Sequence, residues 1–276
     1  MSAASLPYTV LLLLAELAIG GLAMVTVFDA RRQVTAGYVK AGALTVLPLA
    51  MLAGWTFLLL ARADEVEGYA LASRWQWPFG VAFGAFLVAT CAHTAAAMLE
   101  RHRLEVALGA VGSAVGLASL VVLALWLGGP AWSVGGMFLS LVAATAVLGT
   151  SLMAMMWGHW YLTSGRLPKE PMEQMSLVVL GAIVLQIVSV GLAIVVAPRA
   201  VPLEGGLGLS LVANPAFWLR VAVGLAFPLV VTVLAWKAAT IRGMMSATGL
   251  LYIALGLLLA GEVLARGLLF TTGAAV

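Results

Sequence analysis

Eight long apolar runs fill most of this sequence and limit the folds that it can adopt. Each run has about 20 residues or more, which is the length that a helix needs to cross the hydrocarbon core of a bilayer. By residue number the runs are approximately 8–28, 41–61, 78–99, 105–128, 135–162, 175–197, 216–236 and 247–270. The connections between the runs are too short to hold a soluble domain. The sequence therefore predicts a single all-α transmembrane domain over residues 1–276, a bundle of eight spanning helices.

The composition agrees with this prediction and excludes the soluble fold classes. Charged residues make up 9% of the chain, hydrophobic residues 63%, and the mean hydropathy is +1.12. An ordinary soluble domain carries roughly 25% charged residues. The net charge of +3 does not indicate nucleic-acid binding, because the longest basic run is Arg31-Arg32. The single cysteine, Cys91, excludes a disulfide framework, and we expect it to be a small buried residue.

The distribution of basic residues predicts the orientation in the membrane, since cytoplasmic loops carry an excess of Lys and Arg. The loops after the first, third, fifth and seventh runs hold Arg31, Arg32, Lys40, Arg101, Arg103, Arg166, Lys169, Lys237 and Arg242. The other loops hold only Arg62, Arg74 and Arg199. The richer set is predicted to be cytoplasmic, so that both termini lie on the outer side. The segment before residue 8 has no basic side chain, and we interpret the first run as a retained helix rather than a cleaved signal.

Four ionisable residues lie inside the outer halves of the predicted helices, where charge is costly and points to function. They are Glu16, Arg220, Glu262 and Arg266. One interpretation is structural: Glu262 and Arg266, four residues apart on one helix, neutralise each other, and Arg220 extends to the interface. The other is a polar pocket for a quinone headgroup. Quinol oxidation needs hydrogen-bond partners for two oxygens and a group that accepts a proton. Glu16 has no partner in its own helix, so Arg220 or Arg266 is expected to pair with it.

Two histidines near the inner ends of different runs suggest another chemistry. His93 and His159 lie at comparable depth, and two imidazoles on different helices can ligate a haem b. The alternative is that His159 belongs to an interfacial aromatic belt and His93 bonds across helices. His102, in the charged stretch 100–103, is expected to be a solvated loop residue. We find no phosphate loop, cysteine cluster or paired metal-ligand spacing, so no metal site is predicted. If the chain takes part in redox chemistry, other subunits must supply most of the cofactors.

The last run carries a motif that resembles a known family. Residues 257–270 read LLLAGEVLARGLLF. This is similar to the closing helix of the membrane anchor subunits of dimethyl-sulfoxide-reductase-type molybdoenzymes, with its Ala-Gly-Glu-x-x-x-Arg-Gly pattern. The eight-helix count and the pair Trp218 and Arg220 at the start of the seventh run also look similar, and polysulfide-reductase-type anchors share the eight-helix plan. The family places a histidine in the outer loop between the second and third helices. Here residues 61–78 contain no histidine, and the acidic residues in its place are Asp64, Glu65 and Glu67.

The resemblance implies a multi-pass subunit of the bacterial or archaeal cytoplasmic (inner) membrane that binds menaquinol or ubiquinone. It implies two partners: an iron–sulfur subunit that takes the electrons and a molybdopterin-type catalytic subunit that uses them. Two alternatives to an anchor subunit remain open. One is a b-type cytochrome subunit with haem between His93 and His159, and the other is a transporter or accessory assembly subunit. A transporter is expected to show interrupted helices. Pro48 and Pro228 are the prolines well inside runs, and neither pairs with glycine in a way that predicts an unwound segment.

Overall fold

The computed structural model of the chain describes residues 4–164, 167–196 and 211–276. Within these ranges, eight helical segments are long and apolar enough to cross a membrane. The chain is thus a multi-pass α-helical membrane protein, and each predicted run coincides with one of these segments to within a few residues. Residue 197, the predicted end of the sixth run, lies outside the described ranges, as do Arg166 and Arg199 of the predicted loops.

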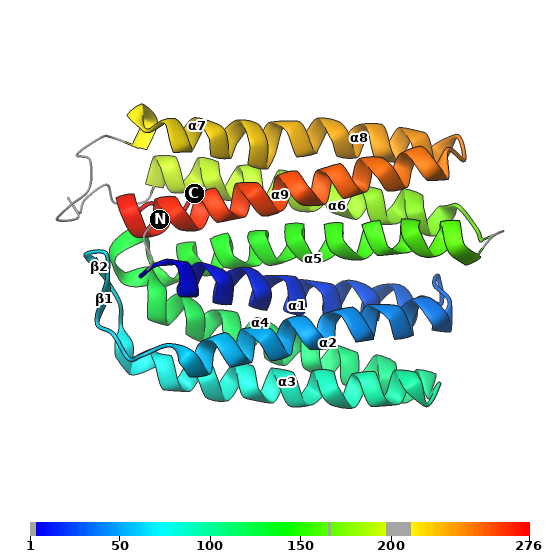
Figure 1. The fold of residues 1–276 in the computed structure, drawn as a ribbon, viewed down its shortest axis with the longest axis horizontal. Helices are drawn as coiled ribbons and strands as arrows, with labels where there is room; N and C mark the ends of the chain where they lie inside the picture. The colour runs from blue at the N-terminus through cyan, green and yellow to red at the C-terminus, as the bar shows by residue number, and fades with distance from the viewer. Residues whose placement is uncertain (1–3, 165–166, 197–210) are drawn as a thin grey trace.

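The helices run side by side along one axis (Figure 1). Their bounds are α1 Leu6–Ala30, α2 Ala36–Leu59, α3 Gln76–Met98, α4 His102–Ala131, α5 Val134–Ser164, α6 Glu170–Val196, α7 Pro215–Val221, α8 Phe227–Thr240 and α9 Met244–Thr272. Short 3-10 turns cover Ser73–Trp75 and Leu211–Ala213, and two short strands are β1 Glu65–Val66 and β2 Tyr69–Ala70. We call the end of the bundle that carries β1 and β2 the hairpin end, and the end that carries residues 31–35, 99–101 and 241–243 the basic end. The start of α1 and the end of α9 both lie at the hairpin end.

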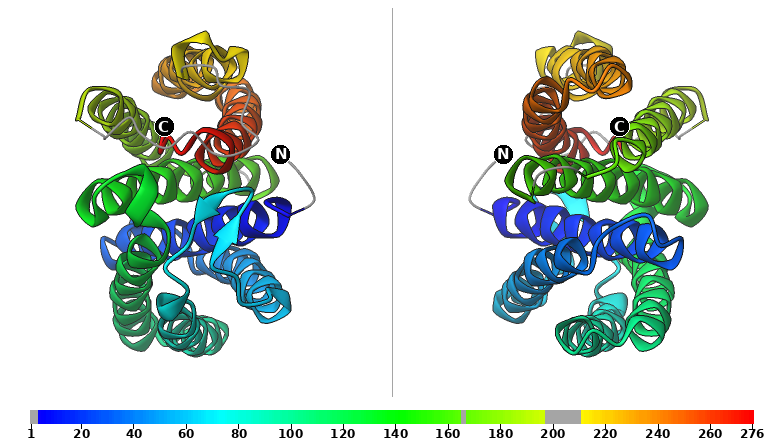
Figure 2. Two further views of the ribbon diagram at one scale, coloured as in Figure 1. Left: turned by 90° about the vertical axis from the view of Figure 1, so that its left-hand side faces the viewer. Right: turned by 90° about the vertical axis from the view of Figure 1, so that its right-hand side faces the viewer.

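The bundle consists of two halves that meet along α1 and α5. Viewed along the axis, α1 to α4 lie on one side and α5 to α9 on the other, with α1 and α5 between them (Figure 2). The contact between the halves is close because Gly20 of α1 and Gly149 of α5 meet backbone to backbone. A Cβ atom built on either glycine would overlap the main chain of the opposite helix. Small residues allow this approach in membranes, where helices associate by packing and hydrogen bonding rather than by the hydrophobic effect.

The outer faces of the bundle are apolar, as expected when lipid is the solvent. Large side chains such as Leu58, Trp77 and Val195 are more than two-thirds exposed. Cys91 is also exposed, so the prediction that it is buried was wrong. Its position on α3 places the thiol on a face that the neighbouring helices leave uncovered, and an apolar stretch does not distinguish such a face from a buried one.

A β-hairpin closes one end of the structure, which the sequence pattern did not predict. β1 and β2 pair antiparallel, with Glu65 opposite Ala70 and Val66 opposite Tyr69. The two turn residues, Glu67 and Gly68, both have positive φ, +55° and +79°. This is the backbone of a tight two-residue hairpin turn, which glycine adopts without steric cost. The hydroxyl of Tyr69 donates to the main-chain oxygen of Leu127, which attaches the hairpin to α4.

The seventh spanning segment, Pro215–Thr240, is not a regular α-helix. Between α7 and α8 the residues Ala222–Ala226 form a π-helical turn, followed by Pro228. Proline lacks the N–H of a regular helical hydrogen bond, and π-turns within helices occur often at functional sites. The sequence indicated no glycine pairing at Pro228, yet Gly224 lies within this turn. The span nevertheless stays one continuous helical segment, and the π-turn within it is a feature that the sequence did not indicate.

Candidate functional site

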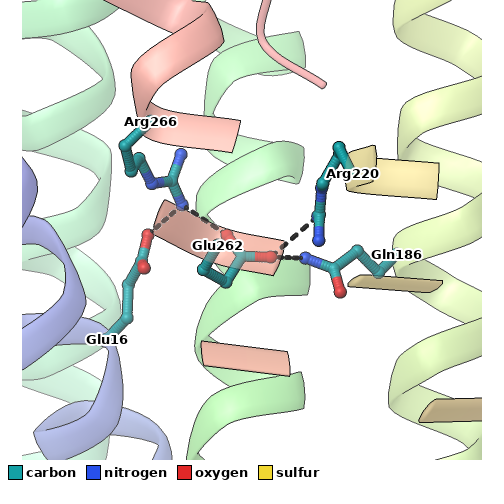
Figure 3. A network of polar contacts seen from close by, with 5 residues as sticks. All are labelled: Glu16, Gln186, Arg220, Glu262 and Arg266. Atoms are coloured by element: carbon teal, nitrogen blue, oxygen red, sulfur yellow. Dashed lines mark hydrogen bonds and ion pairs between the residues drawn. The ribbon is translucent and has the colours of Figure 1, made fainter. Parts of the chain in front are cut away.

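Four of the predicted site residues come together in one buried network. Glu16 lies on α1, Arg220 on α7, and Glu262 and Arg266 on α9 (Figure 3). Glu16 is ten residues from the start of α1 and Glu262 is ten residues from the end of α9. At a rise of 1.5 Å per residue, both carboxylates lie about 15 Å below the hairpin end. The antiparallel arrangement of α1 and α9 therefore brings the two acids to the same level.

Glu262 is the centre of the network. Its Oε1 accepts a hydrogen bond from Nη2 of Arg220 at 2.7 Å and another from the side-chain amide of Gln186 on α6. Nη2 of Arg266 lies 3.3 Å from Oε2 of Glu262 and also donates to Oε1 of Glu16. The chain of contacts thus runs from Glu16 through Arg266 and Glu262 to Arg220, and it links α1 to α9 and α7 (Figure 3).

Burial and charge make this network unusual. All five side chains are buried, and Gln186, at 3% exposed, is the least covered of them. Two carboxylates face two guanidinium groups, so the fully ionised network is neutral. This balance matters because an unpaired charge in the hydrocarbon region is costly. Several polar atoms remain without a partner among the described residues: Glu16 Oε2, Gln186 Oε1, Arg220 Nε and Nη1, and Arg266 Nε. The network therefore retains both donors and acceptors for a further polar molecule or a proton.

The structure shows whether Arg220 extends to the membrane interface or points into the bundle. The suggestion that Arg220 extends to the interface is wrong, because its side chain is 1% exposed and turned inward to Glu262. Glu16 pairs with Arg266, one of the two partners that the sequence left open. Gln186 was not predicted as a site residue, although it is a polar residue inside an apolar run. That isolated polarity was the signal that could have identified it.

A close contact between glycines makes the ion pair between α7 and α9 possible. Gly224 in the π-turn and Gly261 next to Glu262 face each other, and a Cβ on Gly224 would lie 2.7 Å from the Cα of Gly261. The same Cβ would also overlap Nη1 of Arg220. Glycine at both positions lets the two backbones approach closely enough for the guanidinium to fit beside them.

A hollow of about 490 Å³ opens at the hairpin end between α1, α2 and the hairpin. Its lining includes Tyr8, Thr56, Leu59, Glu65 and Glu67. Two of the three predicted outer-loop acids, Glu65 and Glu67, thus border a space that can hold a ring-sized molecule. The third, Asp64, has a structural role instead, because its carboxylate accepts a hydrogen bond from Ser73 and its main-chain oxygen accepts one from Leu71.

Aromatic side chains pack between the hollow and the network. The ring of Tyr8 contacts Trp126 and Phe270, each at 5.9 Å between ring centroids. Phe270 is one helical turn beyond Arg266 on α9, and Tyr8 is eight residues before Glu16 on α1. The hollow and the network therefore lie about 12 Å apart along the helix axis, with this aromatic layer between them.

The two candidate haem ligands do not come together in the arrangement that a haem requires. His93, on α3, is fully buried, and its Nδ1 lies 2.9 Å from the main-chain oxygen of Glu105 on α4. His159, on α5, is exposed, and its Nδ1 lies 3.3 Å from the hydroxyl of Tyr252 on α9. α3 packs against α2 and α4, whereas α5 packs against α1, α4, α6 and α9. The two imidazoles thus belong to separate environments, and these residues do not fit a haem held between them.

The fold and the network together define a polytopic membrane protein with a buried, charge-balanced polar centre. Comparison with protein-family models, with curated proteins and with solved structures found no match to the chain. The resemblance of the last helix to molybdoenzyme anchor subunits therefore stays a prediction. The function of the chain has to be inferred from its residues and their geometry.

Proposed function

We propose that the chain is the quinone-reactive membrane anchor subunit of a multisubunit respiratory oxidoreductase. It exchanges electrons between menaquinol or a related quinone and an iron–sulfur partner subunit, which serves a molybdopterin-type catalytic subunit. Both termini and the hairpin end face the periplasm in this proposal, and the basic end faces the cytoplasm, in keeping with the charge of the loops.

The observation that carries the proposal is the buried network of Glu16, Arg266, Glu262 and Arg220. A purely structural helix bundle gains little from four ionisable groups in its hydrocarbon region, because replacing a buried ion pair with packed apolar side chains is often neutral or stabilising. Charged groups retained at such depth mark proton or substrate pathways in membrane proteins.

The hollow at the hairpin end supports a headgroup site. Thr56 and Tyr8 supply hydroxyl groups for the quinone oxygens, and Glu65 and Glu67 supply carboxylates that accept protons. Oxidation of one quinol releases two protons and two electrons. In this proposal the protons pass to the carboxylates at the hairpin end, and the electrons pass to the iron–sulfur partner. Glu16 and Glu262 then adjust the charge beneath the headgroup.

Substitution of Glu262 tests the proposal. Glu262→Gln removes the acid and keeps the shape, and we expect quinol-linked electron transfer to be lost while the assembled complex stays intact. Glu170→Gln is the matched control, because Glu170 is an exposed acid at the start of α6, at the basic end. Quinol oxidation is measured in membranes, and assembly is measured by the amount of partner subunits that co-purify. Normal turnover of an intact Glu262→Gln complex would overturn the assignment.

One observation favours a second candidate, a transporter. The seventh span changes from α-helical to π-helical geometry at Ala222–Ala226, two residues after Arg220, and helices that are irregular next to a polar site occur in ion-coupled transporters. Co-purification separates the candidates, because an anchor subunit isolates together with iron–sulfur and catalytic subunits and a transporter isolates without them. A reduced-minus-oxidised spectrum without Soret and α bands would exclude the cytochrome alternative.

A further inference from the structure

A second polar cluster lies at the basic end of the bundle, far from the network around Glu262. It joins Asp29, in the last turn of α1, to His102 and Glu105, in the first turn of α4. Nδ1 of His102 lies 3.3 Å from Oδ1 of Asp29 and 3.3 Å from Oε1 of Glu105. The three potential ligand atoms all lie within 4.8 Å of one another. His102 is therefore not the solvated loop residue that the sequence suggested.

No Lys or Arg side chain pairs with the two acids of this cluster. Asp29 and Glu105 are each only 5% exposed. Among the described residues, no Lys or Arg nitrogen lies within 4.0 Å of either carboxylate, and the nearest potential cation is the partly exposed His102. Arg32, Arg101 and Arg103 line an adjoining hollow of about 440 Å³ with His102 but make no ion pair with the two acids. Buried carboxylates are normally paired with a cation or coordinate a metal.

A further observation also points to a ligand. Oδ2 of Asp29 is buried and has no hydrogen-bond partner among the described residues. It belongs to the same carboxylate that meets His102, so it adds a fourth donor atom beside the three. The backbone at Glu105 is fixed as well, because His93 donates from Nδ1 to its main-chain oxygen at 2.9 Å. The backbone that carries the Glu105 carboxylate is thus fixed to α3.

We propose that Asp29, His102 and Glu105 form a divalent-cation site, and that Zn²⁺ is the ion that they fit best. One imidazole nitrogen and two carboxylates are a donor set that Zn²⁺ accepts, with bonds of about 2.0–2.2 Å. Two ligand atoms at the corners of a tetrahedron of that size lie about 3.3–3.6 Å apart. Both separations from His102 have this value. The bound ion neutralises the two acids and joins the end of α1 to the start of α4.

Direct metal binding tests this proposal without reference to quinone chemistry. The full chain is purified in detergent through an affinity tag without histidine, stripped with a chelator, dialysed against ZnCl₂ and then against buffer, and analysed for metal. We expect one Zn²⁺ per chain and a higher thermal unfolding midpoint in the loaded protein. A chain that retains no Zn²⁺ and whose midpoint does not respond to Zn²⁺ would overturn the proposal, whatever the outcome of the Glu262 experiment.

Variants locate the ion. Asp29→Asn and His102→Ala are each expected to reduce retained Zn²⁺ by at least tenfold and to abolish the rise in the unfolding midpoint. His159→Ala is the matched control, because it removes a histidine from the same end of the bundle outside the cluster. Retention of one Zn²⁺ by both cluster variants, or its loss in His159→Ala, would place the ion elsewhere. Should Asp29→Asn fail to fold, the wild-type stoichiometry and His102→Ala still decide the question.

Discussion

Gly224 of the π-turn and Gly261 of α9 lie in direct backbone contact, and this contact sets the distance between Arg220 and Glu262. A methyl group at either position would overlap the opposite backbone and the guanidinium of Arg220. The ion pair between α7 and α9 therefore depends on two residues that carry no charge.

Gly261→Ala is expected to push α9 away from the π-turn and to lower the free energy of unfolding by about 1–3 kcal/mol, the usual cost of overpacking. The measurement is the thermal unfolding midpoint in detergent, followed by tryptophan fluorescence. Gly256→Ala is the control, because a Cβ at Gly256 on the same helix meets nothing within 4 Å. Equal midpoints for the two variants would show that the close contact does not exist.

Glu16 and Arg266 are expected to be energetically coupled. Glu16→Gln leaves Glu262 as the one carboxylate of the network for two guanidinium groups, and breaking a buried pair costs about 3–5 kcal/mol. The double variant Glu16→Gln, Arg266→Met leaves the neutral pair of Glu262 and Arg220, so we expect it to be more stable than Glu16→Gln alone. The check is a double-mutant cycle on unfolding midpoints, and additive losses would contradict the pairing.

Lys40 is expected to control the ionisation of Glu100 in the short connection between α3 and α4. Nζ of Lys40 lies 2.5 Å from Oε1 of Glu100, and this hydrogen bond and the charge of Lys40 lower the pKa of Glu100. A carboxyl with a lowered pKa in the folded state stabilises the protein above its unfolded pKa of about 4.3 and loses this effect as the pH falls through the folded pKa.

NMR titration of glutamate-labelled protein is the measurement for this pair. In Lys40→Ala the pKa of Glu100 should rise toward the ordinary glutamate value. An unchanged titration curve would indicate that the two side chains do not meet in the detergent-solubilised protein.

Tyr69→Phe is expected to loosen the hairpin from α4. The substitution removes the hydroxyl that donates to the main-chain oxygen of Leu127 and keeps the ring contact with Phe270. A lost hydrogen bond of this kind costs about 0.5–1.5 kcal/mol. Amide hydrogen exchange of residues 65–70 is the measurement, with the half-exposed Tyr252→Phe as control. Unchanged protection of the hairpin in Tyr69→Phe would mean that the hydroxyl does not hold it.

The spanning helices could be predicted because the bilayer imposes a length and an apolar composition on each of them. The assembly of Glu16, Arg220, Glu262 and Arg266 could also be anticipated, since charge inside an apolar run is rare enough to identify each member separately. Their pairing could not, because apolar runs do not specify which helices are neighbours.

Three other features could not be predicted from the sequence, each for its own reason. The strands on either side of the turn at Glu67 and Gly68 are too short to show an alternating sequence pattern. Glu67 also has a positive φ, which its residue type does not suggest. Asp29 lies more than seventy residues before His102 and Glu105, so no short metal-ligand spacing relates all three residues of the basic end. The sequence contains many glycines and does not indicate which of them make helix contacts. Gly20 and Gly149 meet because of tertiary packing, whereas a Cβ at Gly84 would meet nothing within 4 Å.

The partners in the pair of Glu16 and Arg266 are 250 residues apart, on the first and the last spanning helix. During synthesis the first helix enters the membrane long before its counter-charge exists. A chain that stops before α9 carries a carboxylate with no guanidinium from α9 to meet it, and charge of that kind in hydrocarbon destabilises a folded bundle. Formation of α9 is therefore the step that supplies the counter-charge of Glu16 and stabilises α1 in the bundle.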